Sequence, residues 1–561
     1  MTSNRITSWP RLALATTLLP AAALAQTTPG TPAATVVAAP APPDGPTSAE
    51  AATAQWYLRD PQQDGVPGTG TTRAYAELLK GRVPTVVVVA VIDSGIDTAH
   101  VDLKPILWRN TREIPGNGID DDHNGYIDDV HGWNFIGGKD GRNISVETLE
   151  MTRVVAKLEP RFKGKTRAQV KPSEQADFDT YTRARKAYDA KRQELTAQVG
   201  QLDQMAGPMT QMFAGLKETL GVTRIDTAVM RQAAAKQSQL APLYQYMLQS
   251  GAADTDAFLA QLTDGGKELH EQLEFGLNPK FNARAEIVQD NPEDTSQRYY
   301  GNNDVTGPDA LHGTHVAGII AAVRDNNLGV QGIAAAPVQV MSVRAVPNGD
   351  ERDKDIANAI RYAVDNGAQI INMSFGKSFS PQRPAVEAAY KYAASKNVLL
   401  VHAAGNENSN LDVTPNFPAS FYINGTVPPT LLTVGASGPK DDEHLPAEFS
   451  NYSKRQVDVF APGVGIFSTL PGSKYGTESG TSMASPVTAG VAAVLKSYYP
   501  SLTAVDLKRI IRQSAQVHHT LVQVPGADKK ADFTTLSATG GVVDLYAALQ
   551  LAAQTAAASG K

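Results

Sequence analysis

Residues 369–404 read QIINMSFGKSFSPQRPAVEAAYKYAASKNVLLVHAA and contain two short apolar stretches with a predicted helix between them. The stretches QIINMSF at 369–375 and VLLVHAA at 398–404 are nearly continuous apolar runs, which are typical of strands buried on both faces. The helix is predicted at 385–395. A strand, a helix and a strand in this order favour a parallel pair of strands, with the helix crossing one face of the sheet.

The same alternation of strand and helix extends to both sides of this unit. Further apolar strands are predicted at 85–92, 338–346 and 431–437, and a further helix at 355–366. Such strands interleaved with helices indicate a mostly parallel sheet that is covered by helices on both faces. The sequence therefore predicts an α/β fold.

Three segments carry residues that could form a nucleophilic centre. Asp93 directly follows a predicted strand, His312 begins the segment HGTHVAG, and Ser482 lies in ESGTSMASP. A serine hydroxyl becomes a good nucleophile when an imidazole takes its proton, and the imidazole needs a carboxylate that fixes its tautomer. Because ligands of open α/β sheets bind beyond the carboxyl ends of the strands, Asp93 lies where such a centre is expected.

The segments VIDSG, HGTHVAG and GTSMASP together closely resemble the motifs of the subtilisin-like serine peptidases, whose triad runs Asp, His, Ser along the chain. The resemblance covers about 50–142 and 296–548. It implies a subtilisin-like three-layer fold and hydrolysis of peptide bonds through an acyl-enzyme. In that mechanism His312 is the base, Ser482 the nucleophile, and Asp93 orients the imidazole. No organic cofactor is implied.

The resemblance also assigns residues around the reaction centre. Asn406 matches the family's oxyanion residue, and its side-chain amide would act together with the backbone N–H of Ser482. His315 matches a structural position. Two segments match those that line the primary specificity pocket, the first of which also pairs with the substrate backbone: Ser374, Phe375 and Gly376, and Ala403, Ala404 and Gly405. Small residues there favour large apolar side chains before the scissile bond.

Residues 120–128, DDDHNGYID, have most features of a calcium-binding loop. Oxygen donors lie at loop positions 1, 3, 5 and 9, and glycine lies at position 6. The predicted ligands are Asp120, Asp122, Asn124, the carbonyl of Tyr126, and Asp128. Position 12 is His131 and not glutamate, so the bidentate ligand must be Asp129 or come from elsewhere. A solvated acidic turn is the alternative to this structural calcium site.

The interval from Asp93 to His312 is several times the roughly 30 residues found in subtilisin. Residues 143–295 are therefore interpreted as an insertion. The residues that recur in it every seven positions are Tyr181, Tyr188, Leu195 and Leu202, with Phe178 and Val199 on the same face. Heptad spacing suits a long amphipathic helix packed on another, and Gly207-Pro208 predicts a break. The expected result is an all-helical subdomain, either a helical hairpin or a small bundle.

The N-terminus has the layout of a secretory signal, with Arg5 and Arg11 before an apolar stretch that ends in Ala23-Leu24-Ala25. A region rich in Pro, Ala and Thr follows, which is typical of a linker. The predicted parts are a signal peptide (1–25), a disordered linker (26–48), the first part of the peptidase domain (49–142), the helical insertion (143–295), the second part of the peptidase domain (296–550) and a tail (551–561).

Charge and cysteine content narrow the function further. The 51 basic and 57 acidic residues give a net charge of −6, which offers no electrostatic case for binding nucleic acid or an anionic membrane. The chain has no cysteine, so disulfides cannot stabilise an exported protein and bound calcium is a candidate for that role. The expected partners are polypeptide substrates.

These observations predict a secreted or periplasmic serine endopeptidase of broad specificity. One alternative is a competent core that acts mainly as a scaffold or self-processing protein and presents the helical insertion to a partner. A further possibility keeps the enzyme and makes the insertion a lid, an exosite, or a folding aid in place of a propeptide.

Overall fold

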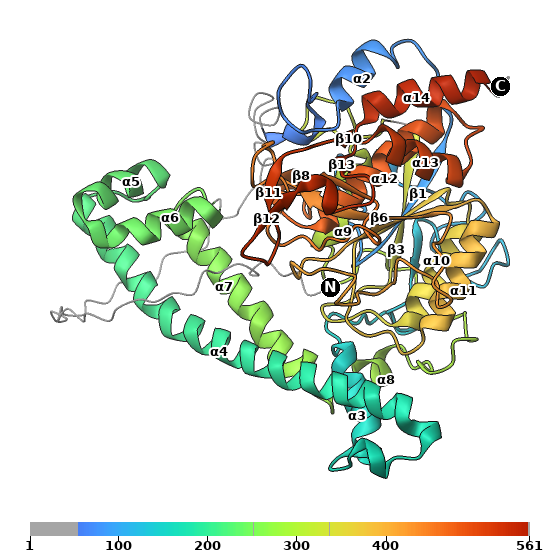
Figure 1. Cartoon of the computed structure of the whole chain (residues 1–561), viewed down its shortest axis with the longest axis horizontal. Helices are drawn as coiled ribbons and strands as arrows, with labels where there is room; N and C mark the ends of the chain where they lie inside the picture. The colour runs from blue at the N-terminus through green and yellow to red at the C-terminus, as the bar shows by residue number, and fades with distance from the viewer. Residues whose placement is uncertain (1–53, 251, 336, 559–561) are drawn as a thin grey trace.

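The computed structural model describes residues 54–558 except 251 and 336 (Figure 1). The predicted signal peptide and linker lie outside the described residues. In this part of the chain no helix combines the length and the apolar character needed to cross a membrane.

Within the described residues, one nine-stranded sheet forms the centre of the molecule. Its strands in spatial order are β10 (Gln516–Val517), β13 (Gly541–Val542), β7 (Val459–Pro462), β6 (Leu431–Ser437), β5 (Leu399–Ala403), β4 (Ile370–Met373), β1 (Val87–Asp93), β3 (Val338–Arg344) and β2 (Gly132–Asn134). Every neighbouring pair is parallel except β10 and β13. The prediction of a mostly parallel sheet is confirmed.

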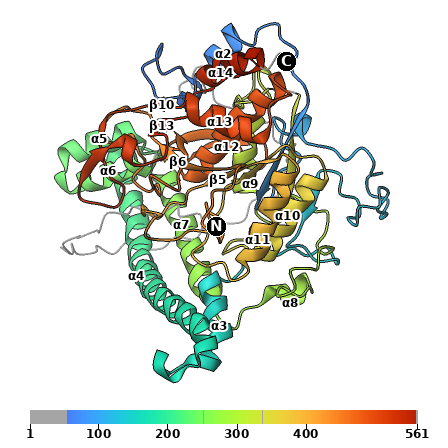
Figure 2. The ribbon, with the colours of Figure 1, turned by 45° about the vertical axis from the view of Figure 1, so that its right-hand side comes forward.

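Helices cover both faces of this sheet (Figure 2). Val87, Val89 and Val91 of β1 lie in one apolar core, and Val88 and Ala90 of the same strand lie in another. The first core contains residues of α2 (Thr71–Glu77), α9 (Leu311–Ala321), α12 (Thr481–Tyr498), α13 (Ala504–Ser514) and α14 (Leu545–Ala558). The second contains residues of α10 (Asp353–Asp365) and α11 (Arg383–Ser395). Because side chains alternate along a strand, β1 is buried from both sides and the fold has three layers.

Smaller elements complete this part of the fold. Two antiparallel hairpins are β8 (Ile466–Leu470) with β9 (Lys474–Glu478), and β11 (Leu521–Gln523) with β12 (Lys530–Asp532). Short 3₁₀ turns lie at Trp56–Leu58, Lys104–Ile106, Arg167–Gln169, Pro172–Glu174, Ser238–Leu240 and Phe533–Thr535, and a π-helical turn at Gln272–Gly276. Helix α14 continues through 551–558, which the sequence assigned to a tail, and Ala552 is fully buried in the first core.

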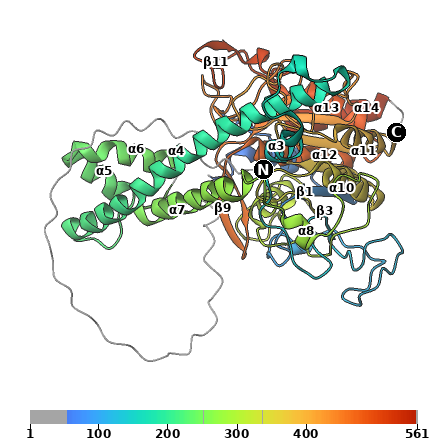
Figure 3. The same ribbon diagram turned by 90° about the horizontal axis from the view of Figure 1, so that it is seen from below.

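The region between β2 and α9 contains α3 (Glu150–Phe162), α4 (Gln175–Leu220), α5 (Thr227–Lys236), α6 (Ala241–Ser250), α7 (Thr255–Glu271) and α8 (Ala283–Ile287). Helices α4 and α7 run antiparallel, because Lys217 pairs with Asp256 at one end and Asp203 with His270 further along. Figures 1 and 3 show them extending away from the sheet, with α5 and α6 at the far end.

The predicted heptad face of α4 is buried. Tyr188 and Leu195 lie in a core that α4 shares with α3 and α7, which we call the proximal core. Helices α4 to α7 form what we call the arm, and a second core around Phe213, Met230 and Phe258 packs its far end. Residues 143–295 thus supply most of the proximal core and all of the second, as the prediction of packed helices requires, and Phe379 also lies in the proximal core.

The predicted break at Gly207-Pro208 is wrong, because α4 is one continuous helix of 46 residues through Pro208. Proline removes one helical hydrogen bond and clashes with the β-carbon of the residue before it. Gly207 has no β-carbon, and Pro208 is exposed, so water can hydrate the freed carbonyl. Both costs are therefore reduced at this position.

Candidate active site

Asp93 and His312 form a short hydrogen bond at the carboxyl edge of the sheet. Asp93 is the last residue of β1 and only 2% exposed, and its Oδ1 lies 2.6 Å from Nδ1 of His312, the second residue of α9. The same Oδ1 accepts from the backbone N–H of Ser94 at 2.8 Å. A β-carbon built on Gly313 would lie 2.1 Å from the carbonyl oxygen of Gly95, so only glycine lets α9 begin this close to β1.

Ser482 is the second residue of α12, which packs against α9 and across the sheet. Its Oγ donates to the carbonyl of Ser374 at 3.3 Å, and the Oγ of Ser374 donates to the carbonyl of Ser482 at 2.8 Å. Asn372 of β4 donates to the Oγ of Ser374 at 2.9 Å. These bonds fix the N-terminus of α12 to the carboxyl end of β4, with the positive dipole end of the helix beside Ser482.

The side chain of Asn406 is held in one orientation by Thr481. Its Oδ1 accepts from the backbone N–H and from the Oγ1 of Thr481, at 2.9 and 2.8 Å, which leaves Nδ2 on the other side of the amide. A β-carbon built on Gly480 would lie 3.5 Å from this Nδ2 and 3.6 Å from the backbone N of Ser482. Two N–H donors therefore lie next to one small space beside Gly480. The sequence did not single out Thr481 or Gly480, because their role depends on contacts with a distant strand end.

The two predicted pocket segments end neighbouring strands. Phe375 and Ala404 are each only 1% exposed, whereas Gly376 and Gly405 are partly exposed. The carboxamide of Asn416 lies between these two glycines. Its Nδ2 would lie 3.0 Å from a β-carbon on Gly376 and 2.7 Å from one on Gly405. Asn416 was missed, because nothing in its local sequence distinguishes it from an ordinary turn residue.

A buried histidine forms a hydrogen bond with the backbone of the first pocket segment. His402 of β5 donates from Nε2 to the carbonyl of Phe375 at 2.8 Å. Burial lowers the pKa of His402 to about 4, and the bond to Phe375 offsets this only in part. The imidazole is therefore neutral at neutral pH and helps to position Phe375 without charge.

The acidic loop brings together only part of the predicted ligand set. Carboxylate oxygens of Glu113, Asp120 and Asp122 all lie within 4.8 Å of one another, and Glu113 was not predicted. Asn124 donates its backbone N–H to Asp120 and Asp122, and its Oδ1 accepts from the backbone N–H of Tyr126 at 2.8 Å. The sequence could have suggested Glu113 only as a nearby acidic residue outside the loop spacing.

The last two acidic residues of the loop have other partners. Asp128 accepts from the backbone N–H groups of Gly116 and Gly118, at 2.7 and 2.9 Å. Asp129 accepts from the hydroxyl of Tyr362 at 2.6 Å, and burial raises its pKa to about 6. Both carboxylates are therefore hydrogen-bonded to groups of the protein around the loop.

Curated relatives match part of the chain. A thermophilic serine proteinase of Bacillus sp. (strain AK1) is 42% identical over 205 residues, which cover 36% of this chain and 46% of that protein. Thermitase of Thermoactinomyces vulgaris is 37% identical over 217 residues, 37% of this chain and 72% of thermitase. Subtilisin E of Bacillus subtilis (strain 168) is 36% identical over 206 residues, 36% of this chain and 50% of that protein. The chain thus spans about half the length of the first and third of these relatives.

Among solved structures, the prenylagaramide maturation protease PagA aligns with a TM-score of 0.35 and 29% identity, covering 43% of this chain and 82% of that one. The match to a protein-family model covers more of the chain than this structure does. Residues 85–541, from just before β1 to the start of β13, match the model of the subtilase family. The chain therefore belongs to the subtilase family.

Proposed function

We propose that this protein is a serine endopeptidase with Asp93, His312 and Ser482 as its catalytic triad. The observation that carries the proposal is the 2.6 Å bond between Asp93 and Nδ1 of His312, in a subtilase whose Ser482 is the second residue of a helix that begins at the same edge of the sheet. The bond places a proton on Nδ1 and leaves Nε2 free to accept one.

The reaction follows from these positions. His312 takes the Oγ proton of Ser482 as the oxygen attacks a peptide carbonyl, and Asp93 stabilises the imidazolium that forms. The N–H groups of Asn406 and Ser482 bind the resulting oxyanion. The imidazolium then protonates the leaving amine, which gives the acyl-enzyme. Water then attacks the acyl carbon while His312 takes its proton. The C–Oγ bond breaks as the imidazolium returns a proton to Oγ, which releases the carboxylic acid and restores Ser482.

Export and broad specificity are parts of the same proposal. Export rests on the basic, apolar and Ala-x-Ala order of the first 25 residues. The proposal of broad specificity rests on Gly376 and Gly405, which present backbone and no side chain at the candidate pocket. The preference for large apolar side chains stays a prediction.

The direct test is hydrolysis of casein by the purified protein, with the new N-termini identified by mass spectrometry. We expect internal cleavage at many sites, which is the product pattern of an endopeptidase. Fragments trimmed only from their ends would exclude an endopeptidase, and intact casein would count against any peptidase activity.

Gly480 provides a test of the oxyanion site. An alanine there keeps the backbone unstrained, because the residue is extended with φ 162°, but its methyl group would lie between the N–H donors of Asn406 and Ser482. We expect kcat to fall about 10²- to 10³-fold, as found in subtilisin when one oxyanion donor is lost, with little change in KM. Gly266→Ala, which adds a methyl group in open space on the arm, is the control. An unchanged kcat in Gly480→Ala would exclude this position for the oxyanion.

We further propose a structural calcium ion bound by Glu113, Asp120 and Asp122. The three carboxylates lie within 4.8 Å of one another, and Arg112, 2.8 Å from Oδ2 of Asp122, offsets only part of their charge. The remaining repulsion favours a bound cation, and oxygen-only ligand sets suit calcium. The ion would fix the loop that precedes β2. We expect chelation to lower the melting temperature of the wild type, because a ligand present at about 100 times its Kd adds roughly 2.7 kcal/mol of stability. Glu113→Gln should melt at the same temperature with and without calcium, and a calcium response equal to that of the wild type would contradict the site.

A further inference from the structure

The segment that leaves the active site after Gly376 enters the core of the insertion. Lys377 and Phe379 are 5% and 4% exposed, and Phe379 packs with Leu149 and Tyr181 in the proximal core. The guanidinium carbon of Arg183, on α4, lies 5.0 Å from the centre of the Phe379 ring. The segment that follows the candidate pocket therefore packs directly against the helices of the insertion.

Lys377 also carries a charge into this contact. Its Nζ lies 2.8 Å from Oε2 of Glu150, 2.8 Å from Oδ1 of Asp353 and 2.7 Å from the carbonyl oxygen of Glu351. Burial alone would lower the pKa of Lys377, but the carboxylates of Asp353 and Glu150 raise it above its usual value. Lys377 is thus a buried cation that is fully paired, and Glu150 is the partner that the insertion supplies.

Glu150 is the first residue of α3 and is itself firmly held. Its Oε2 pairs with Arg153 at 2.6 Å, and its backbone N–H donates to Oδ2 of Asp350 at 2.7 Å. Arg153 in turn donates to the backbone carbonyls of Asp350 and Glu351, each at 3.1 Å. Burial would raise the pKa of Glu150, but Arg153 and Lys377 lower it well below its usual range. The first turn of α3 therefore joins residues 350–353 to Lys377.

The backbone that precedes Lys377 contacts Ser482, the proposed nucleophile. Ser374, three residues earlier, exchanges two hydrogen bonds with Ser482. The backbone of Lys377 exchanges two more with Phe417, at 2.8 and 2.9 Å. Segment 374–377 is therefore fixed at one end by α12 and at the other by Phe417 and the insertion.

We infer that Glu150 and Lys377 are positioning residues, through which the helical insertion fixes segment 374–377 for pairing with the substrate. The inference rests on the proposed peptidase function. It gives α3, where the insertion joins the peptidase domain, a role in substrate binding. A subtilase without such an insertion would lack this contact. Neither residue is a catalytic residue.

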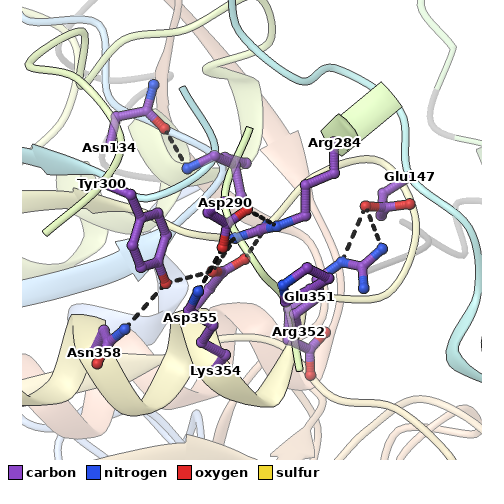
Figure 4. Close-up of polar contacts among 12 residues, drawn as sticks. Asn134, Glu147, Arg284, Asp290, Tyr300, Glu351, Arg352, Lys354, Asp355 and Asn358 are labelled. Carbon is purple, nitrogen blue, oxygen red and sulfur yellow. Dashed lines mark hydrogen bonds and ion pairs between the residues drawn. The ribbon is translucent and has the colours of Figure 1, made fainter. Parts of the chain in front are cut away.

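A second buried ion network at the insertion supplies a matched control (Figure 4). Asp290 lies 2.6 Å from Nε of Arg284 and 2.6 Å from Nζ of Lys354, and all three side chains are at most 2% exposed. Asp355 accepts from Arg284 at 2.7 Å on its other side. Like Glu150, Asp290 is a buried carboxylate shared by one arginine and one lysine. Unlike Lys377, Lys354 lies in the first turn of α10, where the residue before it, Asp353, is the one that pairs with Lys377. The hydrogen bonds of Lys354 Nζ go to Asp290, Asn291 and Gln297.

The experiment compares Glu150→Ala with Asp290→Ala in the full-length protein. KM and kcat are measured with an extended peptide anilide and with an ester of a single acylated amino acid, and melting temperatures are recorded. We expect both variants to melt at lower temperature than the wild type. Only Glu150→Ala should raise KM for the extended peptide, on the order of tenfold, with kcat nearly unchanged and the ester unaffected.

Each outcome separates the two proposals. A wild type without hydrolytic activity refutes the peptidase and this inference with it. An active wild type in which both variants keep the KM of the wild type refutes the positioning role alone. If Glu150→Ala does not fold, Glu150→Gln and Phe379→Leu are measured in its place. Both should then raise KM for the extended peptide only, and unchanged KM values would overturn the inference.

Discussion

Ser482→Ala is expected to lower kcat roughly 10⁶-fold, the loss found in subtilisin when the nucleophile is removed. Without Oγ there is no atom to form the acyl-enzyme, and the oxyanion donors alone give little turnover. The fold should persist, because the change removes one buried oxygen and its 3.3 Å bond to the carbonyl of Ser374. Turnover of casein and of a peptide anilide, with melting temperature as the measure of folding, checks this.

Ser497→Ala is the matched control. Ser497 is also a buried serine of α12, and its Oγ donates to the carbonyl of Thr85 at the far end of the helix. The control should lose some stability and retain its kcat. If Ser482→Ala retained a kcat within tenfold of the wild type, Ser482 would not be the nucleophile.

Asp93→Asn is expected to lower kcat about 10⁴-fold, with KM nearly unchanged. Oδ1 of Asp93 accepts from both Nδ1 of His312 and the N–H of Ser94. An asparagine that turns its Nδ2 toward His312 would donate to Nδ1, so the imidazole would carry its proton on Nε2 and could not accept one from Ser482. It would also lose the charge that stabilises the imidazolium.

The measurement is the pH dependence of kcat for Asp93→Asn beside the wild type. The variant should have low activity across the range in which the wild type is active. A tenfold loss or less would mean that Asp93 does not set the tautomer of His312.

The sheet could be predicted because its signals are local. The apolar residues of β1, β3, β4, β5 and β6 form runs that indicate buried strands without reference to the rest of the chain. The heptad pattern of α4 likewise indicates a buried helix face. Asp93 was predicted at the carboxyl edge because it follows such a run, and Asn406 was assigned from the family resemblance. Strand order in a parallel sheet then brings the ends of these strands together.

What could not be predicted depends on contacts between distant segments. Lys377 and Glu150 are 227 residues apart, and their pairing depends on how α3 enters the fold. The orientation of Asp128 toward Gly116 and Gly118, where the loop pattern predicted a calcium ligand, is set by a turn that lies before the loop. The Gly207-Pro208 prediction was wrong because it used a local rule at a position where the missing β-carbon of Gly207 and the exposure of Pro208 both reduce the cost of a proline in a helix.

The central claim is a nucleophilic Ser482 activated by His312, and labelling with a serine-directed fluorophosphonate tests it most directly. We expect one labelled peptide in the wild type, the one that contains Ser482. Labelling should be lost in Ser482→Ala and greatly slowed in His312→Ala. A folded wild type that stays unlabelled, or one labelled at another serine, would contradict the account.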